Sequence, residues 1–142
     1  RSKVFDDIIK EYPDIKLITE QHVPAEQPIN DAEEITANLL TANPDKDSVT
    51  AIFAAWDEPA IGAAKALAEA GRDEVIVTGV DGNEQAVQMI KDGSCLKATV
   101  KQNFEGMADI VCQQMEKYYA GETIEKGEMY APAELITQEN AQ

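Results

Sequence analysis

Cysteine and histidine are scarce in this sequence, which argues against a metal site or a catalytic site built from these residues. The 142 residues include two cysteines, Cys95 and Cys112, and one histidine, His22. A metal site built from such residues needs several ligands at close spacing, which these three positions do not provide. His22 also has no evident catalytic companions. We therefore interpret all three residues as structural or incidental, and we predict neither a metal nor a cofactor.

Basic residues are also few. The chain carries 12 Lys and Arg against 27 Asp and Glu, a formal net charge of -15. Such a charge repels phosphate backbones and anionic lipid headgroups, so we expect no direct contact of this portion with nucleic acid or a membrane surface. No stretch approaches the length of a membrane span, and Arg1–Lys3 lacks the apolar core of a signal peptide. These residues alone therefore indicate no cellular location.

The length and the hydrophobic pattern predict a single α/β domain. A chain of 142 residues can bury one core without a second domain. Short apolar runs alternate with segments of helical spacing. The expected strands are 15–19, 49–55, 75–80, 96–100 and 135–137, and the expected helices are 4–9, 29–40, 61–70, 86–90 and 104–118. This alternation predicts a largely parallel sheet with helices on both faces.

One strand delivers a carboxylate to the edge of the predicted sheet. The run Val75–Val80 is β-branched nearly throughout, as is typical of a strand buried on both faces, and Asp81 follows it directly. Ligands of open parallel sheets bind beyond the carboxyl ends of the strands, so Asp81 is a candidate ligand-binding residue. Asp81 and Glu84 also fit a capping box on the following helix, and the local sequence alone favours that role.

Two further strands end in side chains able to meet Asp81. Trp56 and Asp57 follow the second expected strand, and Gln102 follows the fourth. Carboxylates and amides share hydrogen bonds among adjacent hydroxyls, while an indole covers the apolar face of a sugar ring, so this rim suits a neutral polyol. Each residue has an alternative interpretation: Trp56 as core, Asp57 as a helix cap, and Gln102 as a partner of loop backbone.

Three stretches carry a resemblance to a known family. Residues Ile52–Ala63, Val77–Gly82 and Ala98–Gln102 resemble, in order and spacing, the C-terminal half of periplasmic sugar-binding proteins of the ribose-binding type. Effector domains of lac-repressor-type regulators share this fold. The resemblance covers nearly the whole chain. It implies that Asp81 is a ligand-contacting position, and that Gln102 is another.

The resemblance also implies that the cleft is incomplete. Family members are longer, with two similar lobes that close around the ligand by a hinge, so residues 1–142 correspond to the C-terminal lobe. Residues 103–130 would normally pack on the other lobe. Trp56 stands where the ribose-binding pattern usually has an Asn, which leaves the sugar unidentified. Arg1 matches the second basic position before the family's aromatic residue, and the ligand-binding Arg is expected just upstream.

These features predict a solute-binding component of an ABC-type sugar importer, which binds a monosaccharide or polyol between its lobes and presents it to the importer's membrane subunits. Its expected location is periplasmic, or extracellular and membrane-anchored. The alternative is the effector domain of a lac-repressor-type transcription regulator, which an upstream DNA-binding headpiece would reveal. An enzyme is not expected, because the loop at 79–82 lacks the G-x-G-x-x-G spacing and no nucleophile, base and oxyanion donors occur together.

The last expected helix carries an apolar stripe that needs cover. The stripe consists of Phe104, Met107, Val111, Met115 and Tyr118. If its usual partner is the second lobe, this face must find another surface in the isolated chain. We predict a domain-swapped homodimer, with hinges at residues 102–103 and 130–132. Folding of the helix back onto its own sheet is the alternative.

Overall fold

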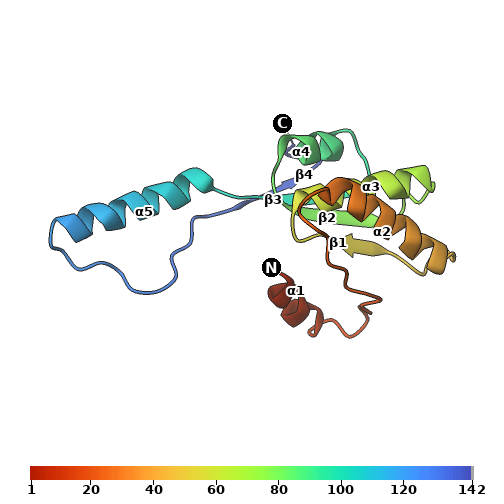
Figure 1. Ribbon diagram of the computed structural model, residues 1–142, viewed down its shortest axis with the longest axis horizontal. Helices are drawn as coiled ribbons and strands as arrows, with labels where there is room; N and C mark the ends of the chain where they lie inside the picture. The colour runs from red at the N-terminus through yellow and green to blue at the C-terminus, as the bar shows by residue number, and fades with distance from the viewer. Residues whose placement is uncertain (142) are drawn as a thin grey trace.

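The computed structural model describes residues 1–141, apart from the side chain of Ser2. Its elements are α1 (Ser2–Ile9), α2 (Pro28–Ala42), β1 (Ala51–Phe53), α3 (Asp57–Glu69), β2 (Ile76–Asp81), α4 (Glu84–Lys91), β3 (Leu96–Lys101), α5 (Phe104–Tyr119) and β4 (Glu134–Thr137). The described strands form one sheet in the order β1-β2-β3-β4 (Figure 1). β1, β2 and β3 are parallel, and β4 is antiparallel to β3. The predicted α/β fold with a largely parallel sheet is confirmed.

The helices cover the two faces of the sheet unequally. α3 and α4 contact the strands and each other, and α2 packs on α3. Right-handed crossovers between neighbouring parallel strands place both connecting helices on the same face. α1 reaches the other face at β1, where the rings of Phe5 and Phe53 stack with centroids 4.5 Å apart. Cover on that face is thin, since Ile76 of β2 is 48% exposed.

The core lies between the sheet and the pair α3 and α4. Its largest fully buried apolar side chains are Val49, Ile61, Leu67, Val75, Val77, Ile90 and Leu96. They come from the strands, or the residues just before them, and from the inner faces of the two helices, as the apolar spacing predicts. Full burial of each such side chain contributes about 1.5–3 kcal/mol. This packing fixes β2 and β3 and therefore the loops at their carboxyl ends.

The prediction of a strand at residues 15–19 is wrong. The structure shows no regular secondary structure from residue 15 to residue 24. The three large apolar side chains of the run, Ile15, Leu17 and Ile18, are 53%, 53% and 52% exposed. A strand is stable only when its backbone pairs with a neighbour, and no backbone hydrogen bond of the described residues joins this run to β1. β1 is also shorter than the expected 49–55.

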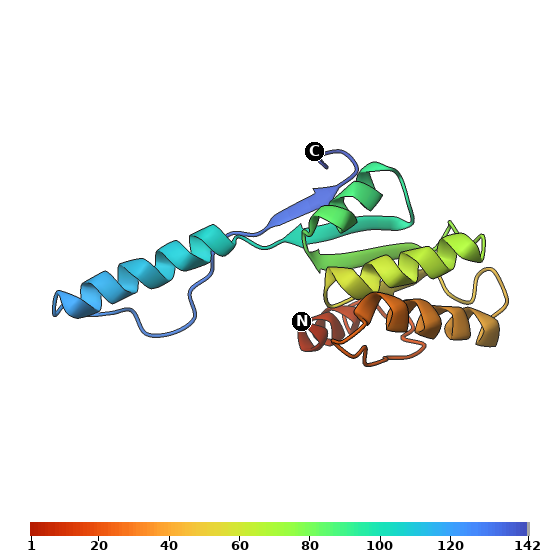
Figure 2. The same cartoon turned by 45° about the horizontal axis from the view of Figure 1, so that its top comes forward.

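The helix α5 stands apart from the rest of the molecule. Figures 1 and 2 show it projecting away from the sheet, joined to it by the segments that follow β3 and precede β4. The expected helix is confirmed, but none of its 16 residues is buried. Phe104, Val111 and Tyr118 are 64%, 57% and 66% exposed. Within residues 1–141 the apolar stripe therefore has no cover.

Candidate functional site

The carboxyl ends of β1, β2 and β3 lie along one edge of the sheet, because these strands are parallel. We call this edge the rim. Asp81 is the last residue of β2, Gln102 directly follows β3, and Trp56 directly precedes α3. The fold thus brings the predicted site residues to one edge. Asp57, the first residue of α3, lies at a different depth from the other three.

Asp81 is the centre of the hydrogen bonding on the rim. Its Oδ1 accepts a hydrogen bond from the Arg1 guanidinium at 2.8 Å and another from the amide nitrogen of Gln102. The Asp81 side chain is 27% exposed. Within the described residues no hydrogen bond uses its Oδ2. Two donors therefore orient the carboxylate through one oxygen and leave the other for a third donor.

Arg1 belongs to this cluster, although the sequence argument expected the ligand-binding arginine upstream of it. Its second guanidinium nitrogen donates to the carbonyl of Ala55, so the side chain bridges the ends of β1 and β2. Arg1 and Asp81 are 80 residues apart, and no local spacing could reveal the pair. The available signal was the match of Arg1 to the second basic position before the family's aromatic residue.

Asp57 lies beneath the rim and not on it. It is fully buried, at 0% exposure. Its Oδ1 accepts from the hydroxyl of Thr99 at 2.6 Å, and its Oδ2 accepts from the backbone N–H of Asn83 at 2.8 Å. A carboxylate with both oxygens bonded inside the protein does not reach a ligand on the rim. The alternative role as a helix cap is also not seen, because its partners lie in the next loop and in β3.

The residue that caps α4 is Asn83, and not Asp81 as the sequence suggested. Asn83 is the N-cap of α4, and its side-chain oxygen accepts from the backbone N–H of Ala86 at 2.8 Å. Asn83 was missed because the pairing of Asp81 with Glu84 matched the usual capping spacing equally well. With Asn83 as the cap, the Asp81 side chain is not needed to hold the helix.

The backbone around Asp81 has an uncommon conformation. Asp81 has φ 137°, the one positive value among the described residues other than glycine, and Gly82 follows with φ 75°. A Cβ on Gly82 would lie 2.6 Å from the Cβ of Lys101, so only glycine fits there. Non-glycine residues in such regions cost about 1–3 kcal/mol and cluster at ligand sites.

Trp56 and Gln102 complete the rim. Trp56 precedes α3 in an extended conformation and is partly exposed, next to the Ala55 carbonyl that Arg1 contacts. Gln102 is also partly exposed, and its backbone N–H donates to the carbonyl of Asp81 at 3.2 Å. The rim therefore combines an indole, a carboxylate, an amide and a guanidinium.

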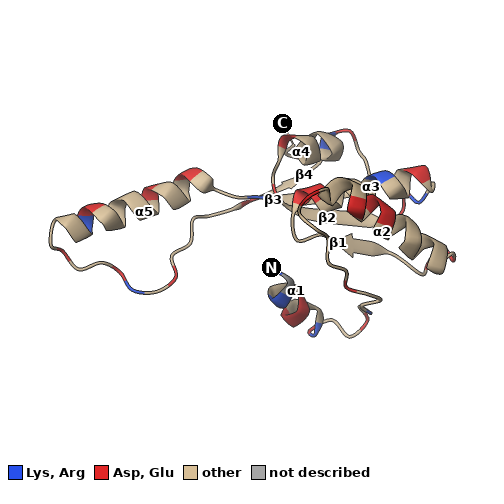
Figure 3. Cartoon of the chain, viewed as in Figure 1, with Lys and Arg blue, Asp and Glu red and all other residues tan. Residues whose placement is uncertain are grey.

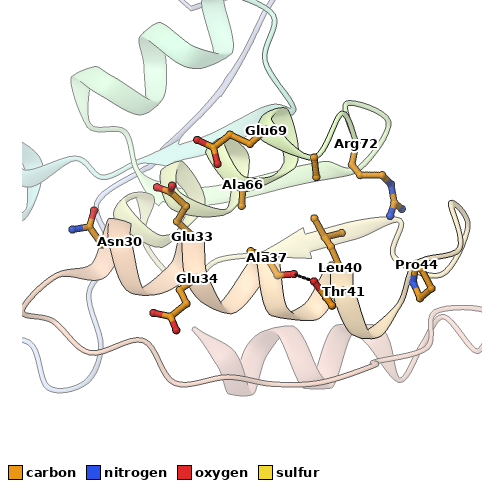
Figure 4. Close-up of a pocket in the computed structure, with 11 residues that line it drawn as sticks. Asn30, Glu33, Glu34, Ala37, Leu40, Thr41, Pro44, Ala66, Glu69 and Arg72 are labelled. Carbon is orange, nitrogen blue, oxygen red and sulfur yellow. Dashed lines mark hydrogen bonds between the residues drawn. The ribbon is translucent and has the colours of Figure 1, made fainter.

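A separate open groove runs between α2 and α3 (Figure 4). Glu33, Glu34 and Glu69 are among its lining residues, and none of the four predicted site residues lines it. The buried guanidinium of Arg72 at one end is already occupied by Glu74 and two backbone carbonyls. The guanidinium that lines this groove is therefore already paired and is not available to a ligand.

Acidic residues outnumber basic ones by 27 to 12, and Figure 3 shows acidic positions along α2, α3 and α5. Within residues 1–141 no group of three or more His, Cys, Asp or Glu side chains is placed to hold a metal ion. None of the described helices combines the length and the apolar character needed to cross a membrane.

The sequence of this chain is similar to those of known sugar-binding proteins. The D-apiose import binding protein of Actinobacillus succinogenes is 32% identical over 142 residues, which is 99% of this chain and 44% of that protein. The ribose import binding protein of Bacillus subtilis is 36% identical over 104 residues, covering 73% of this chain and 32% of that protein. The chain thus spans less than half the length of these curated relatives.

Solved structures agree with the sequence relatives. An ABC transporter solute-binding protein from Agrobacterium vitis with bound allitol superposes with a TM-score of 0.90 at 31% identity, over 99% of this chain and 49% of that one. An ABC sugar transporter subunit from Rhodobacter sphaeroides gives a TM-score of 0.89 at 33% identity, over 98% and 50% of the two chains. A family model described as a periplasmic binding protein domain matches residues 1–123. The chain belongs to the periplasmic binding protein family, and its fold is that of one lobe of the sugar-binding members.

Proposed function

We propose that this chain forms one wall of the cleft of a solute-binding protein that delivers a neutral sugar or polyol to an ABC-type importer. The observation that carries the proposal is the Asp81 carboxylate on the rim, oriented by Arg1 and Gln102 through one oxygen. A charged acceptor held in this way binds hydroxyl donors better than a freely rotating one, because less side-chain entropy is lost on binding.

The remaining rim residues suit the same ligand class. In the proposal, Oδ2 of Asp81 accepts from one or two sugar hydroxyls, while the Arg1 and Gln102 nitrogens donate to hydroxyl oxygens. The Trp56 indole covers the apolar C–H face of the ligand. Asp57 is not assigned a direct contact, because its carboxylate is fully buried.

The ligands of the related proteins support this class. They include D-apiose, ribose and allitol, and a solute-binding protein from Actinobacillus succinogenes holds D-allose. All four are neutral molecules with several adjacent hydroxyls. They differ in carbon number and ring form, so we leave the individual sugar open and propose the polyol class alone.

The proposal extends to the partners and the site of action. We infer that the second wall of the cleft is a further lobe, that the lobes close on the ligand, and that the closed form engages the importer's membrane subunits outside the cytoplasm. The named relatives are binding proteins, and we infer that this chain also turns over no substrate. The net charge of -15 supports the absence of nucleic acid among its direct partners.

Replacement of Asp81 by Ala tests the ligand assignment. The variant loses hydrogen bonds to a charged acceptor, each worth roughly 1.5–3 kcal/mol, so affinity should fall at least about tenfold. Titration calorimetry on the natural protein that contains this chain, with D-ribose, D-allose, D-apiose and allitol, measures the change. Asp73→Ala is the matched control, because Asp73 is an exposed carboxylate just before β2, at the opposite end of that strand. Equal affinity of the Asp81 variant and the wild type would exclude the assignment.

The exposed apolar stripe on α5 also needs another protein surface to cover it. We propose that residues 103–130 pack on the second lobe in the natural protein, and that two copies of the 142-residue chain alone exchange α5 in a two-fold dimer. Leaving the stripe in water forgoes roughly 1.5–3 kcal/mol per large side chain, and the flanking segments seen in Figure 1 provide the hinges. Light scattering over a concentration series should show a dimer. A monomer at every concentration, with α5 protected from hydrogen exchange, would show that the helix folds back instead.

A further inference from the structure

A buried hydrogen-bond network lies directly beneath Asp81. Asp57 at its centre is 0% exposed, and Thr99 on β3 is 1% exposed. The Thr99 hydroxyl donates to Oδ1 of Asp57 at 2.6 Å and accepts from the backbone N–H of Gly82 at 3.2 Å. Oδ2 of Asp57 accepts from the backbone N–H of Asn83 at 2.8 Å. The network therefore binds both N–H groups that follow Asp81: Asp57 binds that of Asn83 directly, and Thr99 binds that of Gly82.

These two N–H groups belong to the turn that aims the Asp81 side chain. Asp81 has φ 137° and Gly82 has φ 75°, so the chain changes direction sharply at the end of β2. Such a backbone conformation persists only when the surrounding structure holds it. The buried acceptors beneath the turn hold its C-terminal side, where they bind the N–H groups of Gly82 and Asn83. The N–H of Gln102, the residue after β3, binds the Asp81 carbonyl and holds the turn from the neighbouring strand.

The glycine at position 79 shows how closely the network is fitted. A Cβ on Gly79 would lie 2.3 Å from Oδ1 of Asp57. The space occupied by the carboxylate is thus available only because β2 has no side chain there. A capping aspartate at the start of a helix would need no such space. The close fit indicates a specific role for the carboxylate in the interior.

We propose that Asp57 is a positioning residue for ligand binding, which acts together with Thr99 by holding the Asp81 turn in its binding conformation. The proposal rests on the function proposed above, in that Asp81 is the ligand's carboxylate acceptor. Asp57 does not touch the ligand. Loss of the network allows the turn to adopt more common backbone conformations, in which the Asp81 carboxylate no longer points to its two donors.

Thr99→Val and Thr99→Ser form a matched pair of variants for the test. Valine has nearly the shape of threonine and lacks the hydroxyl, which leaves the Gly82 N–H without its acceptor and Oδ1 of Asp57 without its donor, whereas serine keeps the hydroxyl. Thr36→Val is the control for a buried threonine elsewhere, because Thr36 lies on α2 at 4% exposure, away from the rim. Asp57→Asn serves if Thr99→Val does not fold: its carboxamide oxygen can still accept from the Asn83 N–H, but its NH2 group then faces Thr99, whose hydroxyl proton loses its acceptor.

The first measurement is hydrogen exchange of the Gly82 and Asn83 amides in the 142-residue chain, followed by NMR without any ligand. We expect protection of both amides in the wild type, in Thr99→Ser and in Thr36→Val. We expect at least tenfold faster exchange at Gly82 in Thr99→Val, with core amides such as that of Val77 unchanged. Unaltered exchange at Gly82 in Thr99→Val would overturn the proposal.

The second measurement is sugar affinity of the natural protein by calorimetry, with D-ribose, D-allose, D-apiose and allitol as probes. Thr99→Val should lose about tenfold or more in affinity, Thr99→Ser should rescue it, and Thr36→Val should bind as the wild type does. A folded Thr99→Val variant with affinity within twofold of the wild type would refute the positioning role. Failure of the wild type to bind any of the four probes would instead count against the proposed ligand class, and the exchange experiment would still decide whether the network holds the turn.

Discussion

The backbone at Asp81 provides a test in which glycine should be more stable than alanine. Asp81→Gly and Asp81→Ala both remove the carboxylate and its bonds to Arg1 and Gln102, so those losses cancel between the two variants. Only the backbone preference differs. In an ordinary strand, glycine is the less stable of the two by roughly 0.5–1 kcal/mol, because it loses more conformational freedom on folding.

At φ 137° the order should reverse. Alanine retains the steric strain of this conformation, about 1–3 kcal/mol, and glycine does not. After subtraction of the entropic cost of glycine, Asp81→Gly should be the more stable variant by roughly 1 kcal/mol, the middle of a range of about 0–2.5 kcal/mol. For a chain of this size, each 1 kcal/mol corresponds to about 2–4 °C in Tm.

Urea denaturation of both variants, followed by circular dichroism, measures the difference between their free energies of unfolding. The m-values should agree, since neither variant changes the surface exposed on unfolding. Ile76→Gly and Ile76→Ala form the control pair: Ile76 is exposed on the same strand and does not have a positive φ, so alanine should be the more stable residue there. If Asp81→Ala equals or exceeds Asp81→Gly in stability, the strained conformation is not the one the protein adopts.

Three further predictions concern the interior. Gly79→Ala should destabilise the fold by about 1–3 kcal/mol, because its Cβ would lie 2.3 Å from Oδ1 of Asp57, and by less in an Asp57→Ala background; equal costs in both backgrounds would show that this contact is not the cause. Gly62→Ala should lower the Tm, because its Cβ would lie 2.1 Å from a backbone carbonyl of α2, and an unchanged melting curve would contradict the α2–α3 packing. A thiol reagent should modify exposed Cys112 in the native chain and Cys95 only on unfolding, since burial raises the pKa of the Cys95 thiol; rapid modification of both would be inconsistent with the structure.

Hydrophobic periodicity was sufficient to predict most of the architecture. The apolar runs at 75–80 and 96–100 became β2 and β3, and the helical stripes between and after them became α4 and α5. The predictions of β2, β3 and α4 succeed because each of these elements buries its apolar residues against a neighbour that the alternation also supplies, whereas α5 forms a helix with none of its residues buried. The run 15–19 has the same apolar content, but in the structure no strand pairs with it. Apolar content indicates a tendency to form a strand, whereas pairing depends on long-range geometry.

The site was predictable in position and only partly in detail. Asp81 could be recognised because it ends an apolar run and stands between glycines, both of which are local signals. Asp57 carried an equally local signal, two residues before a proline at the start of a helix, which suggested a cap or a ligand contact. Its real partners are Asn83 and Thr99, 26 and 42 residues away, and no spacing rule connects them. The same limit applied to Arg1 and Asp81.

The magnitudes explain why a strained residue is tolerated on the rim. Strain at Asp81 costs about 1–3 kcal/mol. The N–H groups of Gly82 and Asn83 bind a buried hydroxyl and a buried carboxylate, which contribute roughly 0.5–1.5 and 1.5–3 kcal/mol. The two hydrogen bonds together are therefore sufficient to offset the strain at Asp81, but they exceed it by only a small free energy. Because the margin is small, removal of the Thr99 hydroxyl alone should release the turn without unfolding the sheet, and this separates the positioning of Asp81 from the stability of the lobe.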